Sequence, residues 1–160
     1  MNLETFSTAD ICDENPESLQ ILETPLTCYG GQSTCQGQIV TFSLDEDNRI
    51  LKNQLQTQGT GKVAVIDVAG DICAVVGDKL AGFAIENGWN GIILNGFLRD
   101  SEKLRKMPIA IWAIGTYPQR STKLNHGFHN VELNFAGVKF KPGAYLYADI
   151  DGILLLDSIT

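Results

Sequence analysis

The sequence is poor in cysteine and has no long apolar run. Only four of its 160 residues are cysteine, at positions 12, 28, 35 and 73, and no two of them have Cys-x-x-Cys spacing. This pattern argues against a zinc site or a disulfide scaffold and favours reduced thiols in a cytoplasm. No apolar stretch approaches the roughly 20 residues that a membrane-spanning helix needs, and the first ten residues lack the basic-then-apolar order of a secretory signal. We therefore expect a cytoplasmic protein with no membrane contact.

Positive charge is scarce as well. Twelve Lys and Arg residues stand against nineteen Asp and Glu residues, which gives a formal net charge of -7. Such a chain repels a phosphate backbone unless a local basic patch overrides the total. A small basic cluster at Lys103, Arg105 and Lys106 is more typical of a solvated face than of a binding patch. We expect no direct binding to nucleic acid.

What remains is an ordinary globular composition, with 44% hydrophobic and 19% charged residues. A chain of this length buries about two-thirds of its unfolded surface without disulfides or metals. The sequence contains no internal repeat, no low-complexity tract and no linker long enough to separate two domains. We expect residues 1–160 to form a single domain.

The middle of the chain carries the strongest secondary-structure pattern. Residues 62–67 and 72–76 are continuous apolar runs, typical of strands buried on both faces. Apolar residues recur at helical spacing over 78–87, and Gly88 then provides a left-handed helix end. Residues 91–94 predict the next strand, with residues 96–100 leaving its carboxyl end as a loop. This strand–helix–strand order predicts a parallel pair, and therefore a βαβ centre.

The flanking segments complete a mixed α/β pattern. A hydroxyl-then-acid start at Ser7 predicts a short first helix, and acidic residues 45–47 precede a helix predicted over 49–58. Further strands are predicted at residues 38–42, 108–114, 131–135, 138–140, 144–148 and 153–156. Turn dipeptides at Pro142-Gly143 and Asp151-Gly152 favour antiparallel strands in the last third of the chain.

Two short polar motifs follow neighbouring strands of this predicted sheet. Arg99-Asp100 comes after the strand at residues 91–94, where open α/β sheets commonly bind ligands. Gly77-Asp78 opens the helix after residues 72–76, and the free N–H groups at the start of a helix attract anions. If the two strands are neighbours, both motifs meet at one end of the sheet.

Together these motifs predict a site for a 2-oxo acid. The Asp100 carboxylate provides oxygen ligands for a hard divalent cation, and the Arg99 guanidinium provides two parallel donors for a substrate carboxylate. The amides of Asp78, Lys79 and Leu80 are available for the remaining oxygens. Metal and amides would then face the charge that develops on an enolate. On these residues alone, Arg99-Asp100 as a solvated ion pair and Asp78 as an ordinary helix cap remain open alternatives.

Other motifs fit turns better than binding sites. Residues 59–62 resemble the end of a phosphate-binding loop, but Val63 replaces the required Ser or Thr and a strand follows. His126 and His129 lie in a polar loop without a third metal ligand. Residues 149–152 begin like a calcium loop, although no glutamate follows at the required distance, and a hairpin turn explains them better.

Taken together, the motifs resemble one family, which contains the regulator of ribonuclease activity A and the class II 4-hydroxy-4-methyl-2-oxoglutarate aldolases. The similarity runs in order along nearly the whole chain, which makes it specific although each fragment alone is weak. The segments that carry it are Thr8 to Asp13, Gly77-Asp78-Lys79-Leu80, residues 86–96, Arg99-Asp100, residues 134–138, Pro142-Gly143 and residues 146–153.

This resemblance implies a swivelling β/β/α fold that assembles as a homotrimer or a hexamer, with sites near subunit boundaries. In the aldolases, the aspartate matching Asp100 ligates magnesium or manganese, and the arginine matching Arg99 holds the pyruvyl carboxylate. The segment matching Gly77 to Leu80 lines the substrate pocket, and the aspartate matching Asp78 positions a water for proton transfer. The implied activities are retro-aldol cleavage of 4-hydroxy-4-methyl-2-oxoglutarate and decarboxylation of oxaloacetate.

The resemblance also implies an alternative function. The other branch of the family inhibits ribonuclease E by binding the enzyme and not RNA, and an acidic surface suits the basic segments of that partner. The best-known kind of that branch lacks the Asp of the Arg-Asp pair, whereas this chain has Asp100. One departure from the aldolases is Lys79, where they usually place an apolar residue. We therefore expect a metal-dependent lyase, with a non-catalytic ribonuclease E inhibitor as the alternative.

Overall fold

The computed structural model describes residues 5–45, 47–68, 70–121 and 127–157. The helices in these residues are α1 Thr8–Glu14, α2 Arg49–Leu55, α3 Asp78–Glu86 and α4 Ser101–Leu104. The strands are β1 Leu19–Ile21, β2 Thr27–Cys28, β3 Cys35–Ser43, β4 Lys62–Asp67, β5 Ala74–Val76, β6 Gly91–Leu98, β7 Ala110–Thr116, β8 Phe128–His129, β9 Leu133–Phe135, β10 Val138–Phe140, β11 Tyr145–Asp149 and β12 Gly152–Leu156.

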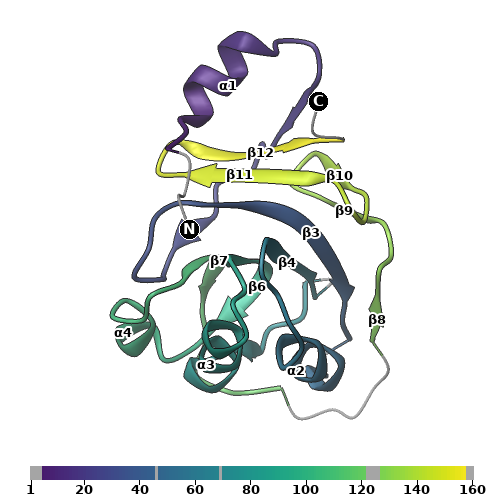
Figure 1. Cartoon of the computed structure of the whole chain (residues 1–160). Coiled ribbons are helices and arrows are strands. Elements are labelled where there is room, and N and C mark those ends of the chain that lie inside the picture. The colour runs from purple at the N-terminus through teal and green to yellow at the C-terminus, as the bar shows by residue number, and fades with distance from the viewer. Residues whose placement is uncertain (1–4, 46, 69, 122–126, 158–160) are drawn as a thin grey trace.

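A parallel sheet forms the centre of the molecule. Strands β3, β4, β6 and β7 lie side by side and all run in the same direction. Helices α2 and α3 cover one face of this sheet (Figure 1), and α3 connects β5 to β6, which also pair in parallel. The predicted βαβ centre is therefore confirmed.

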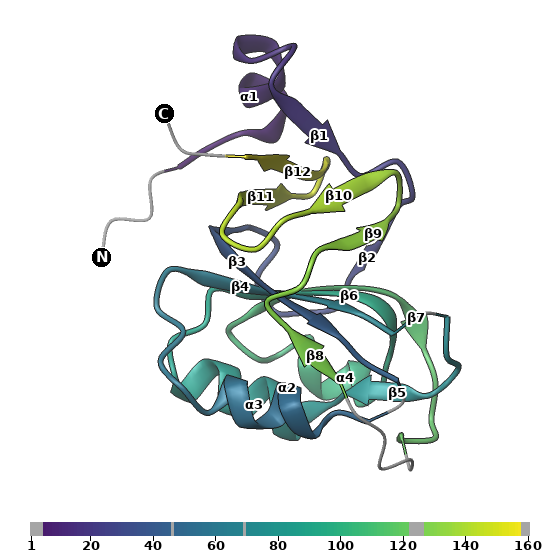
Figure 2. The ribbon, with the colours of Figure 1, turned by 90° about the vertical axis from the view of Figure 1, so that its right-hand side faces the viewer.

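The opposite face of the central sheet is covered by antiparallel strands. Strands β1, β12 and β11 continue the sheet beyond β3, while β9 and β10 form a separate pair. Strand β3 belongs to both parts of the sheet and joins them. Its residues 35–38 pair with β11, and its residues 38–43 pair with β4. Two β layers and one helical layer result (Figure 2), which is the predicted β/β/α arrangement.

The alternation of side chains along β4 explains why all four of its central residues, 63–66, are apolar. Val63 and Val65 pack into the core between the two β layers, whereas Ala64 and Ile66 pack into the core beneath the helices. All four are fully buried. Complete burial of a Val or Ile side chain stabilises a fold by roughly 1.5–3 kcal/mol, so both faces of this strand contribute.

Asp149 fastens the first helix to the outer β layer. Its carboxylate accepts hydrogen bonds from the Thr8 backbone N–H at 2.9 Å, the Thr8 hydroxyl at 2.6 Å and the Asp151 N–H at 2.9 Å. Burial of this carboxylate raises its pKa, but the donated hydrogen bonds outweigh burial and leave the pKa of Asp149 below its ordinary value. Residues 149–152 thus form a hairpin turn between β11 and β12, and not a calcium loop.

Several predicted boundaries and one predicted pairing are wrong; for example, β3 begins at Cys35 and not at residue 38, and β7 spans Ala110–Thr116 and not residues 108–114. Helix α2 ends at Leu55 and not at residue 58. Strand β10 pairs with β9, so the Pro142-Gly143 turn does not join two paired strands. The region predicted as a loop at residues 96–100 is largely strand, because β6 continues to Leu98 with an irregularity after Leu94. The last difference matters for the site, because the extension of β6 pairs with β5.

Candidate functional site

The pairing of β5 with the end of β6 brings the two polar motifs together. Val76 lies opposite Leu98 in this parallel pair, so the residues that follow the two strands become neighbours. The backbone N–H of Asp78, at the start of α3, donates a hydrogen bond of 3.1 Å to Oδ2 of Asp100. Two motifs that are 22 residues apart in the chain therefore meet, as we expected on the condition that the two strands are neighbours.

The backbone of Asp100 is shaped for this contact. Asp100 has left-handed dihedral angles, with φ 60° and ψ 32°, and its side chain does not cap the short helix α4 that follows it. Left-handed backbone costs most L residues about 1–2 kcal/mol, although Asp and Asn tolerate it. The carboxylate instead caps α3, whose own cap residue, Gly77, has no side chain.

Gly77 gives the Asp100 carboxylate the space that it occupies. A Cβ at this position would lie 2.7 Å from Oδ2 of Asp100, closer than real Cβ contacts allow. The backbone of Gly77 is extended, with φ -142°, so any residue could adopt its dihedral angles. The glycine therefore leaves room for the neighbouring carboxylate and is not needed for backbone freedom.

Two carboxyl groups share this end of the sheet. Hydrogen bonding with the Asp100 carboxyl lowers the pKa of Asp78 from its ordinary value, and the Lys103 ammonium, 3.4 Å from Oδ2 of Asp78, lowers it further against the opposing effect of burial. Adjacent carboxyl groups repel when both are ionised, unless they share a proton or a cation. The neighbouring carboxyl groups of Asp78 and Asp100 therefore favour a positively charged group beside them.

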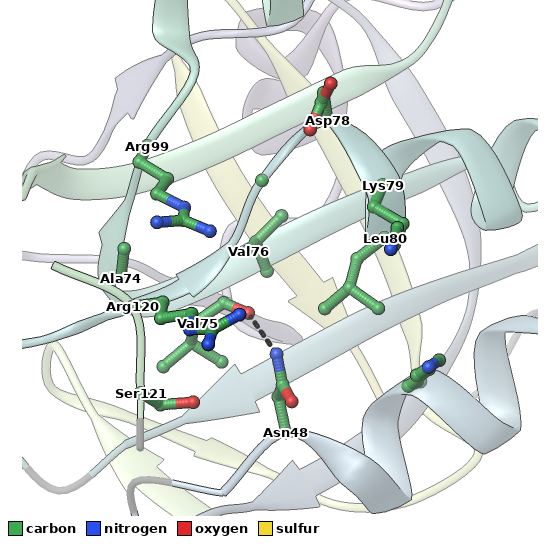
Figure 3. Close-up of a pocket in the computed structure, with 12 residues that line it drawn as sticks. Asn48, Ala74, Val75, Val76, Asp78, Lys79, Leu80, Arg99, Arg120 and Ser121 are labelled. Atoms are coloured by element: carbon green, nitrogen blue, oxygen red, sulfur yellow. Dashed lines mark hydrogen bonds between the residues drawn. The ribbon is translucent and has the colours of Figure 1, made fainter. Parts of the chain in front are cut away.

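A cleft of about 470 Å³ opens beside these groups. The Arg99 and Arg120 guanidinium groups lie on one side of the cleft, and the start of α3 lies on the other (Figure 3). Arg99 also donates a long hydrogen bond of 3.5 Å to the Pro118 carbonyl. The lining residues are Asn48, Lys52, Ala74, Val75, Val76, Gly77, Asp78, Lys79, Leu80, Arg99, Arg120 and Ser121.

The cleft therefore contains five of the six residues predicted for the site, namely Gly77, Asp78, Lys79, Leu80 and Arg99. Asp100 is not among the lining residues but is held against Gly77 and Asp78. The cleft is lined by four cationic side chains and one carboxylate, in a chain whose net charge is -7. Such local concentration of positive charge in a concave site favours a small anion.

Sequence reasoning missed Asn48, Lys52, Arg120 and Ser121. Asn48 begins α2 and donates its side-chain amide to the Val75 carbonyl at 3.0 Å, which ties α2 to the floor of the cleft (Figure 3). No motif in the sequence marks these residues. They enter the cleft through contacts between elements far apart in the chain.

The expectation for the helix amides needs a correction. The Asp78 N–H is used by Asp100. One of the three amides expected to face the ligand is thus engaged within the protein. The Arg99 guanidinium and the other cationic side chains are the positively charged groups that line the cleft.

The donor set fits a magnesium-like ion better than a structural metal. The part of the chain that the structure describes contains no group of three or more His, Cys, Asp or Glu side chains that could hold a metal. Magnesium is typically bound by one or two carboxylates and completes its shell with water and substrate oxygens. Asp100 provides one such carboxylate. His129 instead stacks on Phe42, with ring centroids 6.5 Å apart, and His126 lies outside the described residues.

A second hollow, of about 580 Å³, differs in character from the cleft. None of its lining residues is charged, and they include Phe6, Ile85 and Trp89. It has no cationic side chain to attract a carboxylate and no carboxylate to bind a hard metal ion. The charged cleft is therefore the candidate functional site.

Fold and cleft together define an α/β protein with a cationic cleft at the carboxyl ends of parallel strands. The chain belongs to the Aldolase/RraA family, described as RraA-like, which it matches over residues 8–155. The resemblance noted from the sequence is thus confirmed. In the described residues, no helix is both long and apolar enough to cross a membrane.

Known relatives cover almost the entire chain. A protein from Pseudomonas syringae pv. tomato is 40% identical over 154 residues, which are 96% of this chain and 95% of the relative. A protein from Dechloromonas aromatica is 42% identical over 156 residues, which are 94% of this chain and 96% of the relative. Both carry the provisional name 4-hydroxy-4-methyl-2-oxoglutarate aldolase.

Two solved structures have closely similar folds. One is described as an S-adenosylmethionine:2-dimethylmenaquinone methyltransferase from Geobacillus kaustophilus; it is 41% identical, with a TM-score of 0.93 over 96% of both chains. The other is described as the RNA-processing inhibitor RraA from Thermus thermophilus; it is 35% identical, with a TM-score of 0.92 over 98% of this chain and 95% of that chain. The names of these neighbours disagree, so function has to be argued from the site.

Proposed function

We propose that the protein is a divalent-metal-dependent lyase that cleaves a carbon–carbon bond in pyruvyl 2-oxo acids. The substrates proposed are 4-hydroxy-4-methyl-2-oxoglutarate and oxaloacetate. The observation that carries the proposal is the convergence of Arg99, Asp78 and Asp100 at one cationic cleft. The provisional aldolase names of relatives at about 40% identity support it.

Each residue has a separate task in this proposal. The Arg99 guanidinium binds the carboxylate next to the 2-oxo group and fixes the orientation of the substrate. Asp100, with Asp78 beside it, holds magnesium or manganese, which when bound polarises the 2-oxo group as a Lewis acid. Lys79 and Leu80 form the wall at the start of α3.

The reaction balances without a further reagent. The bond between C3 and C4 breaks, and its electron pair gives the enolate of pyruvate. From oxaloacetate the other fragment leaves as carbon dioxide; in the aldol case the 4-hydroxyl loses its proton and becomes the ketone of a second pyruvate. The enolate then takes up a proton at C3. We assign the transfer of these protons to Asp78, acting through a water molecule.

Assembly and location follow from the same proposal. We propose a homotrimer, or a hexamer of two trimers, as the resemblance implies. All four cysteines are free thiols, which supports a cytoplasmic location, since cytoplasmic thiols are kept reduced.

Measurement of pyruvate release tests the proposal. Oxaloacetate and 4-hydroxy-4-methyl-2-oxoglutarate are supplied with magnesium or manganese, then with excess chelator, and pyruvate is followed with a coupled dehydrogenase. We expect turnover well above the metal-only background, lost on chelation. Arg99→Gln is expected to raise KM at least about tenfold, because a charged hydrogen-bond pair is lost. Arg105→Gln, an exposed arginine outside the cleft, is the matched control. Rates equal to the metal-only background would contradict the proposal.

The cleft does not suit the methyltransferase name of the neighbour from Geobacillus kaustophilus. S-adenosylmethionine carries a positive sulfonium, a positive amino group and one carboxylate, which leave it with a net positive charge, whereas the cleft is lined by Lys52, Lys79, Arg99 and Arg120. Like charges disfavour binding. The lyase proposal has no such conflict.

A second candidate is a non-catalytic inhibitor that binds ribonuclease E. The neighbour from Thermus thermophilus, an RNA-processing inhibitor at 35% identity, favours it, and the net charge of -7 suits a basic partner surface. Inhibition of RNA cleavage by purified ribonuclease E measures this activity directly. If the protein inhibits cleavage and releases no pyruvate above background, the inhibitor is the function; inhibition unchanged in Asp100→Asn would show that it does not use the cleft.

A further inference from the structure

The uncharged hollow lies at the opposite end of the parallel strands from the charged cleft. Its lining includes residues 34–36, 88–90 and 108, which stand at or just before the first residues of β3, β6 and β7. The cleft instead follows the last residues of β5 and β6. The volume of the hollow, about 580 Å³, is within the usual range for small-molecule sites. The proposed lyase reaction uses none of the residues that line it.

Aromatic side chains with fixed positions line the hollow. The Trp89 indole N–H donates to the Thr57 carbonyl at 3.1 Å, and the ring lies so close to Gly59 that a Cβ there would collide with it. The Phe6 ring packs edge-to-face against Tyr147, with ring centroids 5.1 Å apart. Rigid aromatic surface favours a flat ring over a flexible chain, because less conformational freedom is lost on binding.

The hydrogen-bonding side chains of the hollow are amides and a hydroxyl. The Asn90 side-chain N–H donates to the Gln36 carbonyl at 2.7 Å, which orients this amide and leaves its oxygen as an acceptor. In the part of the chain that the structure describes, the side chains of Gln32 and Thr34 form no hydrogen bond with another residue. These groups are therefore available to the amide-type donors and acceptors of a ligand.

The hollow also lacks charge near neutral pH. The described residues that line it include no Asp, Glu, Lys, Arg or His. Burial raises the pKa of the Cys35 thiol to about 12, so this lining group stays protonated. An ion that enters such a pocket loses its hydration without gaining a charged partner. The lining therefore favours an uncharged ligand.

We propose that this hollow is a second binding site, for an uncharged ligand that has a planar ring and amide-type hydrogen-bonding groups. The aromatic and apolar surface contacts the ring, and Gln32, Thr34 and Asn90 pair with its polar edge. The inference does not rest on the proposed lyase, because the hollow and the cleft share no lining residue.

Two probes of the same shape test this chemistry. Quinoline-3-carboxamide is uncharged near pH 7, whereas quinoline-3-carboxylate carries a negative charge on the same ring system. Binding to the full chain is followed by the NMR signals of the indole N–H groups. Trp89 lines the hollow, and Trp112, which is buried in the core between the two β layers, is the internal reference. Trp112→Phe assigns the signals.

The expected result is selective binding of the uncharged probe. We expect the carboxamide to shift the Trp89 signal and not the Trp112 signal, with a dissociation constant of about 1 mM or tighter for a ligand of this size. The carboxylate should bind at Trp89 at least about tenfold more weakly, because its charge finds no partner there.

Matched variants locate the binding. Thr34→Phe places a larger side chain in the wall of the hollow and is expected to weaken carboxamide binding at least about fivefold. Ser33→Phe, at the exposed neighbouring residue outside the hollow, should stay within about twofold of wild type. Gln32→Lys adds a cation to the lining and should reduce the preference for the carboxamide at least about threefold. Gln56→Lys, exposed and outside the hollow, is its control.

Three results would overturn the inference. One is a Trp89 signal that the carboxamide leaves unmoved up to its solubility limit, or that both probes move equally. Another is equal carboxamide affinity in Thr34→Phe and Ser33→Phe. The third is a change of assembly size in Thr34→Phe together with no carboxamide binding to wild type, which would mean that a second copy of the chain covers the hollow. Pyruvate release is measured separately, so failure of the lyase proposal leaves this inference standing, and the reverse also holds.

Discussion

The carboxylates of Asp149 and Asp100 make the same kind of contact in two different parts of the molecule. Each is a carboxylate that accepts a backbone N–H from the start of a helix in another part of the chain. Asp149 accepts three hydrogen bonds, two from Thr8 and one from Asp151. Asp100 accepts one backbone N–H, at 3.1 Å, and lies beside a second carboxyl group, that of Asp78.

The difference shows how structural and functional carboxylates can be told apart. A carboxylate has about four lone-pair positions, so Asp149 is almost saturated by the protein itself. Asp100 keeps acceptor capacity, has left-handed backbone and lies at a cationic cleft. The lone-pair positions of Asp100 that accept no hydrogen bond within the protein are available to a ligand.

The largest expected effect separates these roles at Asp100. Asn keeps an oxygen for the Asp78 N–H and tolerates left-handed backbone, but it lacks the charge that holds a cation. We expect Asp100→Asn to lower kcat for oxaloacetate at least about 100-fold, with the free energy of unfolding in urea changed by less than about 0.5 kcal/mol. Asp100→Ala should also lose about 1 kcal/mol of stability, since the cap is removed. Normal turnover in Asp100→Asn would mean that Asp100 holds no metal.

At Asp149 the expected loss is in stability. Asp149→Ala leaves the donors of Thr8 without their acceptor, and we expect the free energy of unfolding to fall by about 3 kcal/mol. Turnover per folded molecule should remain. Asp151→Ala, at the exposed neighbouring turn position, is the matched control, expected within about 0.5 kcal/mol of wild type. Equal stability of the two variants would show that Asp149 does not anchor α1.

A smaller effect is expected from crowding the Asp100 carboxylate. In Gly77→Ala the new Cβ would have to displace Oδ2 of Asp100, which it would approach to 2.7 Å. Displacements near a reacting centre lower rates strongly, and we expect a loss of about tenfold or more in kcat/KM. Gly82→Ala, in the interior of α3 with nothing within 4 Å of its Cβ, should keep activity and gain about 0.5–1 kcal/mol of stability. If Gly77→Ala and Gly82→Ala both keep full activity, the result contradicts the placement of the Asp100 carboxylate in the site.

The smallest effect concerns pH. Because the pKa of Asp149 is lowered in the folded state, its stabilising contribution is present in full above the unfolded pKa of about 3.9 and is lost as pH falls toward the folded pKa. Thr8→Val removes one donor, so the difference in unfolding free energy from wild type should be about 1 kcal/mol near pH 6 and smaller near pH 3. Thr8→Ser keeps the hydroxyl as a control. A difference independent of pH would assign the loss to packing instead.

The sequence predicted a helix or strand best where the residues of that element alone determine its conformation. Strand β4 agrees with its predicted range of residues 62–67 because both of its faces are buried and its four central residues are all apolar. Helix α3 begins at the predicted Asp78, and Gly88 has the predicted left-handed backbone, with φ 79°. The extension of β6 was missed because Gly96 is typical of a loop, whereas pairing with β5 and β7 makes it part of a strand.

The order of residues along the chain determined the α/β class, the βαβ centre and the two motifs Gly77-Asp78 and Arg99-Asp100. Only the tertiary structure decided that the two motifs touch, that Asp100 caps α3, and that Lys52 and Arg120 join the same cleft. The physical reason is that local backbone preferences and burial patterns act over a few residues. Contacts between residues far apart depend instead on which strands pair, and here on the pairing of β5 with the end of β6.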